Sequence, residues 1–308
     1  MAKVAFVFPG QGAQQVGMGK AAFDGSDIAR RTFESADAAL DAPLSRMCFE
    51  GPDTELQLTA NSQPAILATS IALLRALGER CDVVAGHSLG EYSANVCAGT
   101  LGFEDAVRLV RKRGLYMQDA VPVGQGAMAA VLGGDAAMVE AACREAGGTV
   151  EPVNYNCPGQ LVLAGETAAV HAVIRLIETR GAKAKLLPVS APFHCALMKP
   201  AEQRLEVDLR ATKFAAPEVP IYVNVDAAPI QSADAARDAL VRQVSRPVRW
   251  QQAIERMVAD GVGLFVEIGP GKALTGMIRR IAKDAKRANV ESPADFEAAR
   301  KAIAEARG

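Results

Sequence analysis

The sequence is poor in histidine, with three in 308 residues, so few of its side chains can exchange a proton near neutral pH. It also lacks an excess of either charge, because 34 Lys and Arg residues stand against 35 Asp and Glu residues. This balance gives no general attraction to polyanions, and we expect no nucleic-acid partner. No apolar run approaches the roughly 20 residues that span a bilayer, so we expect no membrane partner either.

The six cysteines lack the C-x-x-C spacing of zinc sites and redox motifs. Their scatter predicts reduced, mostly buried thiols, without a disulfide framework or a bound metal. The N-terminus lacks the charged, long apolar and small-residue segments that form a secretory signal in that order. Together these absences predict a cytoplasmic protein.

Apolar strands and amphipathic helices alternate along most of the chain. This alternation is typical of an α/β fold with a mostly parallel sheet flanked by helices. The segments that carry the pattern are predicted strands at 3–8, 82–86 and 263–269 and predicted helices at 61–80, 91–99, 104–119 and 273–283, the first helix being capped by Asn61 or Ser62.

The middle of the chain has a different order, β-α-β-β-α-β, which is the ferredoxin-like unit. We therefore predict a ferredoxin-like small domain at 124–190, inserted into a discontinuous large domain formed by 1–123 and 191–308. The tail at 292–308 is predicted to be a surface helix. The elements of the insert are expected at 126–132, 135–146, 150–155, 160–164, 167–180 and 183–189.

The stretch FPGQGAQQVGMG at 8–19 places a glycine-rich turn directly after a strand. Backbone N–H groups in such a turn can approach an anion. The turn fails the dinucleotide fingerprint because Gln15 stands where the third glycine belongs. It also fails the P-loop pattern, because Gly19-Lys20 has no glycine five residues earlier and is followed by Ala21. An anion other than a nucleotide phosphate is indicated.

The segment GHSLG at 86–90 matches G-x-S-x-G between an apolar strand and a helix. A sharp strand–helix turn of this kind projects a serine hydroxyl, and the glycines relieve crowding. This context favours Ser88 as a nucleophile. The alternative is a tight turn in which the serine only caps the helix.

A nucleophilic serine needs a base, and the three histidines allow a choice by elimination. His87 neighbours Ser88 on the turn, so its side chain is expected to point elsewhere. His171 lies within a helix of the predicted insert. His194 lies in the loop SAPFHCALMKP at the domain junction, where clefts form, and is the favoured base. An acid or a backbone carbonyl could orient it, and the sequence leaves this open.

Arg113 shares the apolar side of its predicted helix, which also carries Ala106, Val110 and Met117 at steps of four, three and four. An inward guanidinium stays charged and needs an anion. One reading is an internal salt bridge with Asp or Glu. The other is a fork for a substrate carboxylate.

Several segments together resemble the malonyl-CoA:acyl-carrier-protein transacylases of bacterial type II fatty acid synthesis. They are FPGQGAQ, GHSLGEYSA, RKRGLYMQ, NYNCPGQLVLAG, PFHCALMKPA and FVEIGPGKALTG, and the resemblance spans about residues 3–280. It implies transfer of malonyl from malonyl-CoA to the phosphopantetheine thiol of acyl carrier protein, through a malonyl-serine. It implies no metal or redox cofactor, and a hydrolase-like large domain carrying the ferredoxin-like insert.

Carried over by motif, the resemblance implies a role for each matching residue. Ser88 is the nucleophile, His194 the base and Arg113 the group that binds the malonyl carboxylate. The other implied roles are the oxyanion-hole N–H groups of Gln11 and Leu89, the histidine-orienting carbonyl of Gln243, exclusion of a 2-methyl branch by Phe193, and cleft lining by Asn156 and Gln160.

Two other functions fit parts of the pattern. A serine thioesterase or esterase would use the same Ser88–His194 pair for hydrolysis, but simple esters offer no carboxylate to Arg113. A carrier-protein-binding module without activity would need neither the nucleophile nor the base, and both are present.

Overall fold

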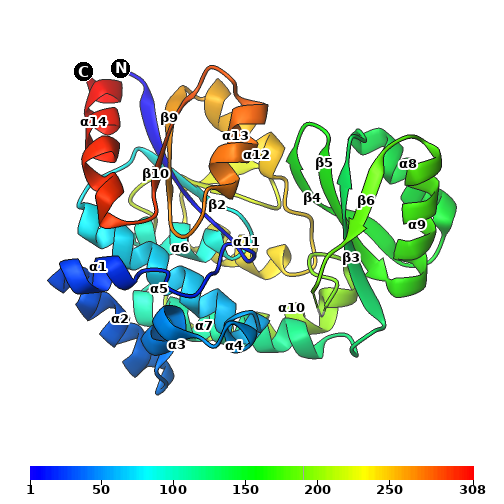
Figure 1. The fold of residues 1–308 in the computed structure, drawn as a ribbon, viewed down its shortest axis with the longest axis horizontal. Helices are drawn as coiled ribbons and strands as arrows, with labels where there is room; N and C mark the ends of the chain where they lie inside the picture. The colour runs from blue at the N-terminus through cyan, green and yellow to red at the C-terminus, as the bar shows by residue number, and fades with distance from the viewer. Residues whose placement is uncertain (190) are drawn as a thin grey trace.

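The computed structural model describes residues 1–189 and 191–308. The predicted end of the small domain at residue 190 therefore lies outside the described residues. Within them the chain forms an α/β fold with two sheets, which occupy opposite ends of the molecule (Figure 1). The larger has the strand order β10-β9-β1-β2-β7-β8 and the smaller the order β4-β5-β3-β6.

The larger sheet is parallel except at its edge, where β8 runs antiparallel to β7. The prediction of a mostly parallel sheet is therefore confirmed for this part of the chain. Its strands are β1 (Lys3–Phe8), β2 (Val83–Gly86), β7 (Ile221–Val223), β8 (Ala228–Ile230), β9 (Val262–Ile268) and β10 (Lys286–Val290).

Strand β1 is central and nearly all apolar because both of its faces are covered. Val4, Phe6 and Phe8 point into one core cluster, whereas Ala5 and Val7 point into another. The first cluster is covered by α2 (Asp27–Leu40), α5 (Thr59–Leu77), α6 (Gly90–Cys97) and α7 (Phe103–Asp119), and the second by α12 (Trp250–Ala259) and α13 (Ala273–Ile281).

Helix α5 begins at Thr59, two residues before the predicted cap at Asn61. The Asn61 side chain instead donates to the Glu55 carbonyl oxygen in the preceding turn, at 2.7 Å. The remaining helices outside 126–186 are α1 (Lys20–Gly25), α3 (Leu44–Glu50), α4 (Asp53–Leu56), η1 (Ala196–Met198), α10 (Lys199–Ala211), α11 (Ala233–Gln243), η2 (Pro293–Asp295) and α14 (Phe296–Arg307).

The smaller sheet is antiparallel throughout the part that is described. It has its own apolar core, formed with α8 and α9, and each predicted element of this region is present. The segment between α11 and α12 contacts this sheet, because Val248 forms an isolated bridge to Asn154 of β4 and its N–H donates to the Val153 carbonyl at 2.8 Å. The elements are β3 (Gly126–Leu132), α8 (Ala136–Ala146), β4 (Val150–Cys157), β5 (Gln160–Glu166), α9 (Thr167–Thr179) and β6 (Lys183–Leu186).

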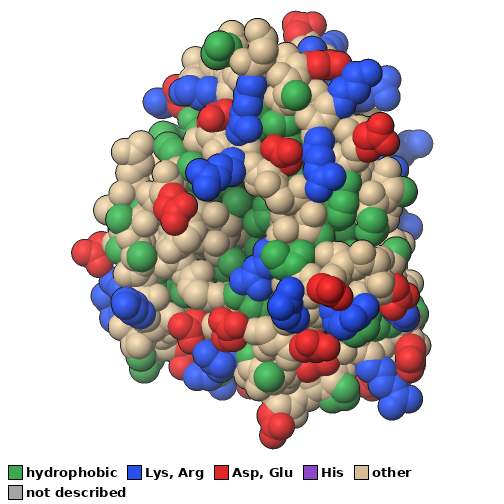
Figure 2. All heavy atoms as spheres, turned by 90° about the vertical axis from the view of Figure 1, so that its left-hand side faces the viewer, with side chains coloured by type: hydrophobic (Ala, Val, Ile, Leu, Met, Phe, Trp, Pro, Cys, Tyr) green, Lys and Arg blue, Asp and Glu red, His purple; other side chains and the backbone are tan. Residues whose placement is uncertain are grey.

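The two termini lie side by side (Figure 1), because the Ala2 N–H donates to the Ala306 carbonyl at 3.0 Å. The predicted tail helix α14 buries Ala299 and Ile303, so one of its faces belongs to the core of the larger sheet. On the side of the molecule that carries α14, basic and acidic side chains are interspersed (Figure 2). Among the described helices, none combines the length and hydropathy needed to cross a bilayer. The six cysteines are free thiols.

Candidate active site

Ser88 stands on the sharp turn between β2 and α6 in the left-handed backbone region, with φ of 51°. A non-glycine residue adopts this region only where its surroundings hold it there. A Cβ at Gly86 would lie 1.9 Å from the Gly90 carbonyl carbon, and one at Gly90 would lie 2.0 Å from the Phe8 oxygen. The two glycines of the motif thus let the turn press against the end of β1.

His194 lies beside this serine, with Nε2 2.6 Å from Ser88 Oγ. Its Nδ1 lies 2.8 Å from the Gln243 carbonyl oxygen, and donation there leaves Nε2 as the proton acceptor. A backbone carbonyl, rather than an acid, therefore orients the ring. Burial and the nearby Arg113 lower the pKa of His194 to about 3, so the ring is neutral at neutral pH. His171, by contrast, is exposed on α9.

Arg113 is 2% exposed and points at the same serine. It donates to Ser88 Oγ at 3.1 Å, to Gln63 Oε1 at 2.8 Å and to Gln243 Oε1 at 3.0 Å. No carboxylate forms a salt bridge with it among residues 1–189 and 191–308. The internal salt bridge is therefore absent there. Neutral amides hold a buried cation whose charge faces the nucleophile.

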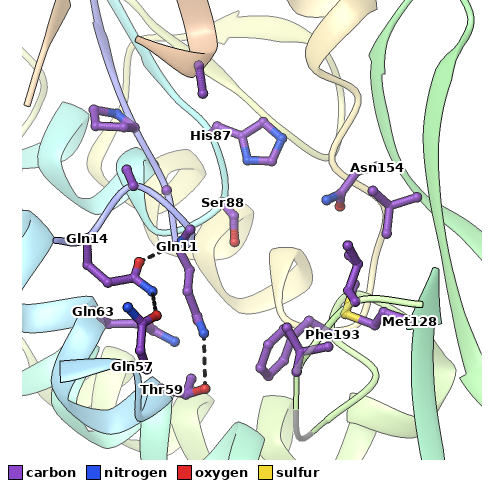
Figure 3. A pocket seen from close by; sticks show the side chains of 18 of the residues that line it. Gln11, Gln14, Gln57, Thr59, Gln63, His87, Ser88, Met128, Asn154 and Phe193 are labelled. Atoms are coloured by element: carbon purple, nitrogen blue, oxygen red, sulfur yellow. Dashed lines mark hydrogen bonds between the residues drawn. The ribbon is translucent and has the colours of Figure 1, made fainter. Parts of the chain in front are cut away.

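A cavity of about 880 Å³ opens in front of Ser88, His194 and Arg113. The turn after β1, the start of α5 and the smaller sheet all contribute to its wall. Figure 3 shows Phe193 and Met128 on one wall of this cavity, together with Asn154 from β4. The Phe193 side chain is 8% exposed. The cavity has the size and the mainly apolar wall of a small-molecule site.

The turn after β1 lies against the serine turn. A Cβ at Gly10 would meet the His87 carbonyl oxygen at 2.4 Å, so only glycine permits this approach. The Gln11 side chain is held by a 3.2 Å hydrogen bond from Nε2 to Thr59 Oγ1 (Figure 3). The backbone N–H groups of Gln11 and Leu89 have no acceptor in the part of the chain that is described. These are the two N–H groups that the family resemblance assigns to the oxyanion hole.

The His87 ring bonds to Asn156 rather than to Ser88 Oγ, as expected of a residue that is not the base. His87 still lines the cavity (Figure 3). Its Nε2 lies 2.9 Å from Asn156 Oδ1, and its ring packs on Trp250. Burial lowers the pKa of His87, so this ring is a neutral hydrogen-bonding group. Its pairing brings the predicted Asn156 to the cavity wall.

Gln160, which was also expected to line the cleft, is not in the described cavity wall. It begins β5 at the end of a hairpin, opposite Cys157, whose thiol donates to Gln160 Oε1 at 3.3 Å. The side chain is absent from the described cavity wall because the hairpin register turns it toward Cys157.

The sequence analysis missed two residues beside the serine turn. Asn224 bonds to the Ser88 N–H and the Gly86 carbonyl, and Glu91 accepts the Asn224 N–H. The sequence feature that could have identified Asn224 is its position as the polar residue in the otherwise apolar stretch IYVNV at 221–225.

The fold and this site define a class of protein. The pattern of the acyl transferase domain family matches residues 5–295, and the chain belongs to that family. The names of its relatives specify a particular acyl transfer reaction. The malonyl CoA-acyl carrier protein transacylase of Escherichia coli K12 is 48% identical over 97% of this chain and 99% of its own length. The same-named protein of Bacillus subtilis 168 is 44% identical over 97% of this chain and 96% of its own.

Solved structures give the same result. The acyl-carrier-protein S-malonyltransferase of Bartonella henselae has a TM-score of 0.96 at 44% identity, with 98% of this chain and 99% of that chain covered. A malonyl-transacylase in complex with a type II PKS acyl-carrier protein has a TM-score of 0.95 at 44% identity. There 98% of this chain and 100% of that chain are covered.

Proposed function

We propose that this protein transfers the malonyl group from malonyl-CoA to the phosphopantetheine thiol of acyl carrier protein, through a malonyl ester on Ser88. The observation that carries the proposal is the Arg113 guanidinium, which lies 3.1 Å from the nucleophilic oxygen with no carboxylate partner among the described residues. A carboxylate-bearing acyl group supplies that partner. The names of the relatives support the same pair of substrates. The reaction needs no metal or redox cofactor, because the first half-reaction converts a thioester into an oxygen ester and the second converts that ester back into a thioester, with no change of oxidation state.

In the first half-reaction, His194 Nε2 takes the proton of Ser88 Oγ as this oxygen attacks the thioester carbonyl carbon. The carbonyl oxygen becomes an oxyanion that accepts from the Gln11 and Leu89 N–H groups, each such donor contributing about 2.7–4 kcal/mol. The tetrahedral intermediate then breaks its carbon–sulfur bond. Coenzyme A leaves as the thiol with the proton from His194, and the malonyl carboxylate stays on Arg113.

The second half-reaction repeats these steps in reverse. His194 takes the proton of the carrier's phosphopantetheine thiol, and the sulfur attacks the malonyl-serine ester. The carbon–oxygen bond breaks, and Ser88 Oγ recovers its proton from His194. Mass spectrometry of carrier protein incubated with enzyme and malonyl-CoA tests the proposal. Malonylated carrier is expected, and carrier that stays unmodified at every enzyme concentration would refute it.

We expect the acylation rate to stay constant as the pH is lowered from 7 to about 5, because the pKa of His194 is lowered to about 3. The neutral ring is the base, and a lowered pKa preserves it in acid. The measurement is kcat/KM for malonyl-CoA across this range. A half-loss near the ordinary histidine pKa of about 6.5 would contradict the assigned environment.

Circular dichroism at each pH controls for unfolding in that experiment. The unfolded chain binds the His194 proton before the folded chain does, because the folded pKa is the lower one. This residue therefore costs stability progressively as the pH falls from about 6.5 toward 3. Only pH values at which the protein remains folded enter the comparison.

Phe193 is proposed to exclude acyl groups with a 2-methyl branch, because its ring occupies the cavity wall (Figure 3). Phe193→Ala is expected to raise the ratio of methylmalonyl to malonyl transfer by about tenfold or more, the scale at which one methyl group is discriminated. Competition between the two CoA thioesters measures the ratio, and Phe193→Leu should give an intermediate value. An unchanged ratio in both variants would rule out this role.

We also propose that the chain comprises a hydrolase-like large domain, at 1–123 and 191–308, and a ferredoxin-like insert at 124–190. The β-α-β-β-α-β order, the strand order β4-β5-β3-β6 and the separate apolar core support the insert. Native-state hydrogen exchange tests it, since the strands of the insert should open as a cooperative unit of their own. Opening only together with β1 and β9 would contradict the division.

A further inference from the structure

Asn224 is a fully buried side chain at the end of β7 that contacts the serine turn on two sides. Its Oδ1 accepts the Ser88 N–H at 2.7 Å, and its Nδ2 donates to the Gly86 carbonyl at 2.7 Å. One amide thus holds the backbone before and after His87. Because the Ser88 N–H is engaged in this way, it is not available as an oxyanion donor.

Glu91 holds Asn224 in turn. It lies in the first turn of α6, is fully buried, and accepts the Asn224 backbone N–H on Oε2 at 2.7 Å. Its Oε1 makes no hydrogen bond of standard geometry in the described part of the structure, although the Gln243 side chain lies near enough to lower the pKa of the carboxyl group. Burial disfavours the charged form of this carboxyl group and costs stability, so stability alone does not account for Glu91 at this position.

The contacts of Asn224 hold the backbone of Ser88, which lies in the left-handed region. Ser88 holds φ of 51°, and in this backbone conformation its Oγ contacts both His194 and Arg113. On the other side of the turn, Gln243 Nε2 donates to the Ser88 carbonyl at 3.0 Å. The peptide groups flanking Ser88 are therefore fixed by side chains from two distant segments, one of which is held by Glu91.

We propose that Asn224 and Glu91 are positioning residues for the nucleophile. Glu91 fixes the backbone of Asn224, and the Asn224 amide holds Ser88 in the left-handed conformation that directs Oγ to His194. The inference rests on the proposed role of Ser88 and extends it to two residues that touch no reacting atom.

Burial raises the pKa of Glu91 to about 7, whereas hydrogen bonds from the Asn224 N–H and the Gln243 side chain, and then the positive charge of Arg113, oppose that rise. Glu91 is thus partly charged at neutral pH, and its charge must be separated from its hydrogen bond in a test. Glu91→Gln makes this separation, because glutamine keeps an oxygen for the Asn224 N–H and carries no charge. Glu91→Leu removes both.

The test measures the rate of malonyl-Ser88 formation at saturating malonyl-CoA, by rapid quench and mass spectrometry, together with KM. Asn224→Ala and Glu91→Leu are each expected to slow acylation by about 10²-fold with little change in KM, the cost of a misplaced reacting atom. The double variant should be no slower than the slower single variant, because the two residues act in one chain of contacts. Glu91→Gln should acylate at close to the wild-type rate, because glutamine keeps the acceptor oxygen and lacks only the charge.

Asp82→Leu is the matched control. Asp82 also accepts a backbone N–H at 2.7 Å, that of Val4, but at the opposite end of β2 from the serine turn. Its loss should lower Tm and leave the acylation rate unchanged. This contrast separates positioning from general destabilisation, which Tm reports for every variant.

Each further outcome decides one claim. If the wild-type protein forms no malonyl-serine, the proposed function is wrong and the positioning role falls with it. If it does, and Asn224→Ala acylates at the same rate, the positioning role alone is wrong. Losses that multiply in the double variant would also overturn it, as would a Glu91→Gln rate as low as that of Asn224→Ala. The isosteric glutamine keeps this comparison available even if Glu91→Leu does not fold.

Discussion

Protein carrying Ser88→Ala should gain no mass when mixed with malonyl-CoA, whereas the wild-type protein gains one malonyl group. The alanine has no oxygen to attack the thioester, and neither His194 nor Arg113 can replace it. Transfer to the carrier should fall by about 10⁴-fold or more, the scale on which removal of a nucleophile acts. Intact-protein mass spectrometry and a transfer assay give the two readouts.

Ser93→Ala is the control for this experiment. Ser93 is also a buried serine, on α6, and its hydroxyl has no partner among the described residues. The Ser93 variant should acylate like the wild-type protein. A malonyl adduct on the Ser88 variant would show that another residue is the nucleophile, and peptide mapping would locate it.

Arg113→Ala should lose malonyl transfer by about 10²–10³-fold, because two charge-assisted hydrogen bonds to the substrate carboxylate disappear. Acetyl-CoA carries no such carboxylate and serves as the internal reference. Arg113 also donates to Ser88 Oγ, so acetyl transfer reports what the variant loses through the nucleophile itself. The ratio of kcat/KM for the two thioesters therefore isolates the carboxylate contact.

Arg113→Lys refines this experiment. Lysine keeps the charge but not the planar fork that matches a carboxylate. It should recover part of the preference for malonyl over acetyl, without reaching the wild-type value. Equal loss of malonyl and acetyl transfer in Arg113→Ala would contradict the assignment of Arg113 to the substrate carboxylate.

Ser88, His194 and Arg113 could be selected from the sequence for different physical reasons. Ser88 lies in a local turn motif whose geometry follows from its own glycines. His194 follows by elimination, because only three histidines exist. Arg113 follows from helical spacing, since a charge on an apolar stripe must face inward. The two alternatives for its anion could not be separated without the positions of every acidic side chain.

Contacts that use the backbone or join distant segments were not predictable in this way. The carbonyl of Gln243 orients His194 across 49 residues, and every residue has such a carbonyl, so only the family resemblance pointed to it. Asn224 and Glu91 are 133 residues apart. Their hydrogen bond forms because β7 pairs with β2, and neither local sequence predicts that long-range pairing.

The elements of the smaller sheet were predictable because each has a local signal in its periodicity or turns. The pairing register of β4 and β5, which the sequence does not reveal, determines which of their side chains face the cavity. Asn156 reaches the cavity wall, whereas Gln160, four residues on, pairs with Cys157 at the end of the hairpin. His87 turns from Ser88 to Asn156, as expected, but its place in the cavity wall could not be predicted because the cavity depends on the distant segment that carries Asn156.

The measurement that tests the central claim most directly is the fate of the isolated malonyl-enzyme. The wild-type protein is acylated, freed of malonyl-CoA, and then divided between buffer alone and buffer with acyl carrier protein bearing its phosphopantetheine thiol. A transferase should keep its ester in buffer and lose it to the carrier, which gains the malonyl group. An ester that is lost to water at the same rate with or without the carrier would identify a hydrolase and contradict the account.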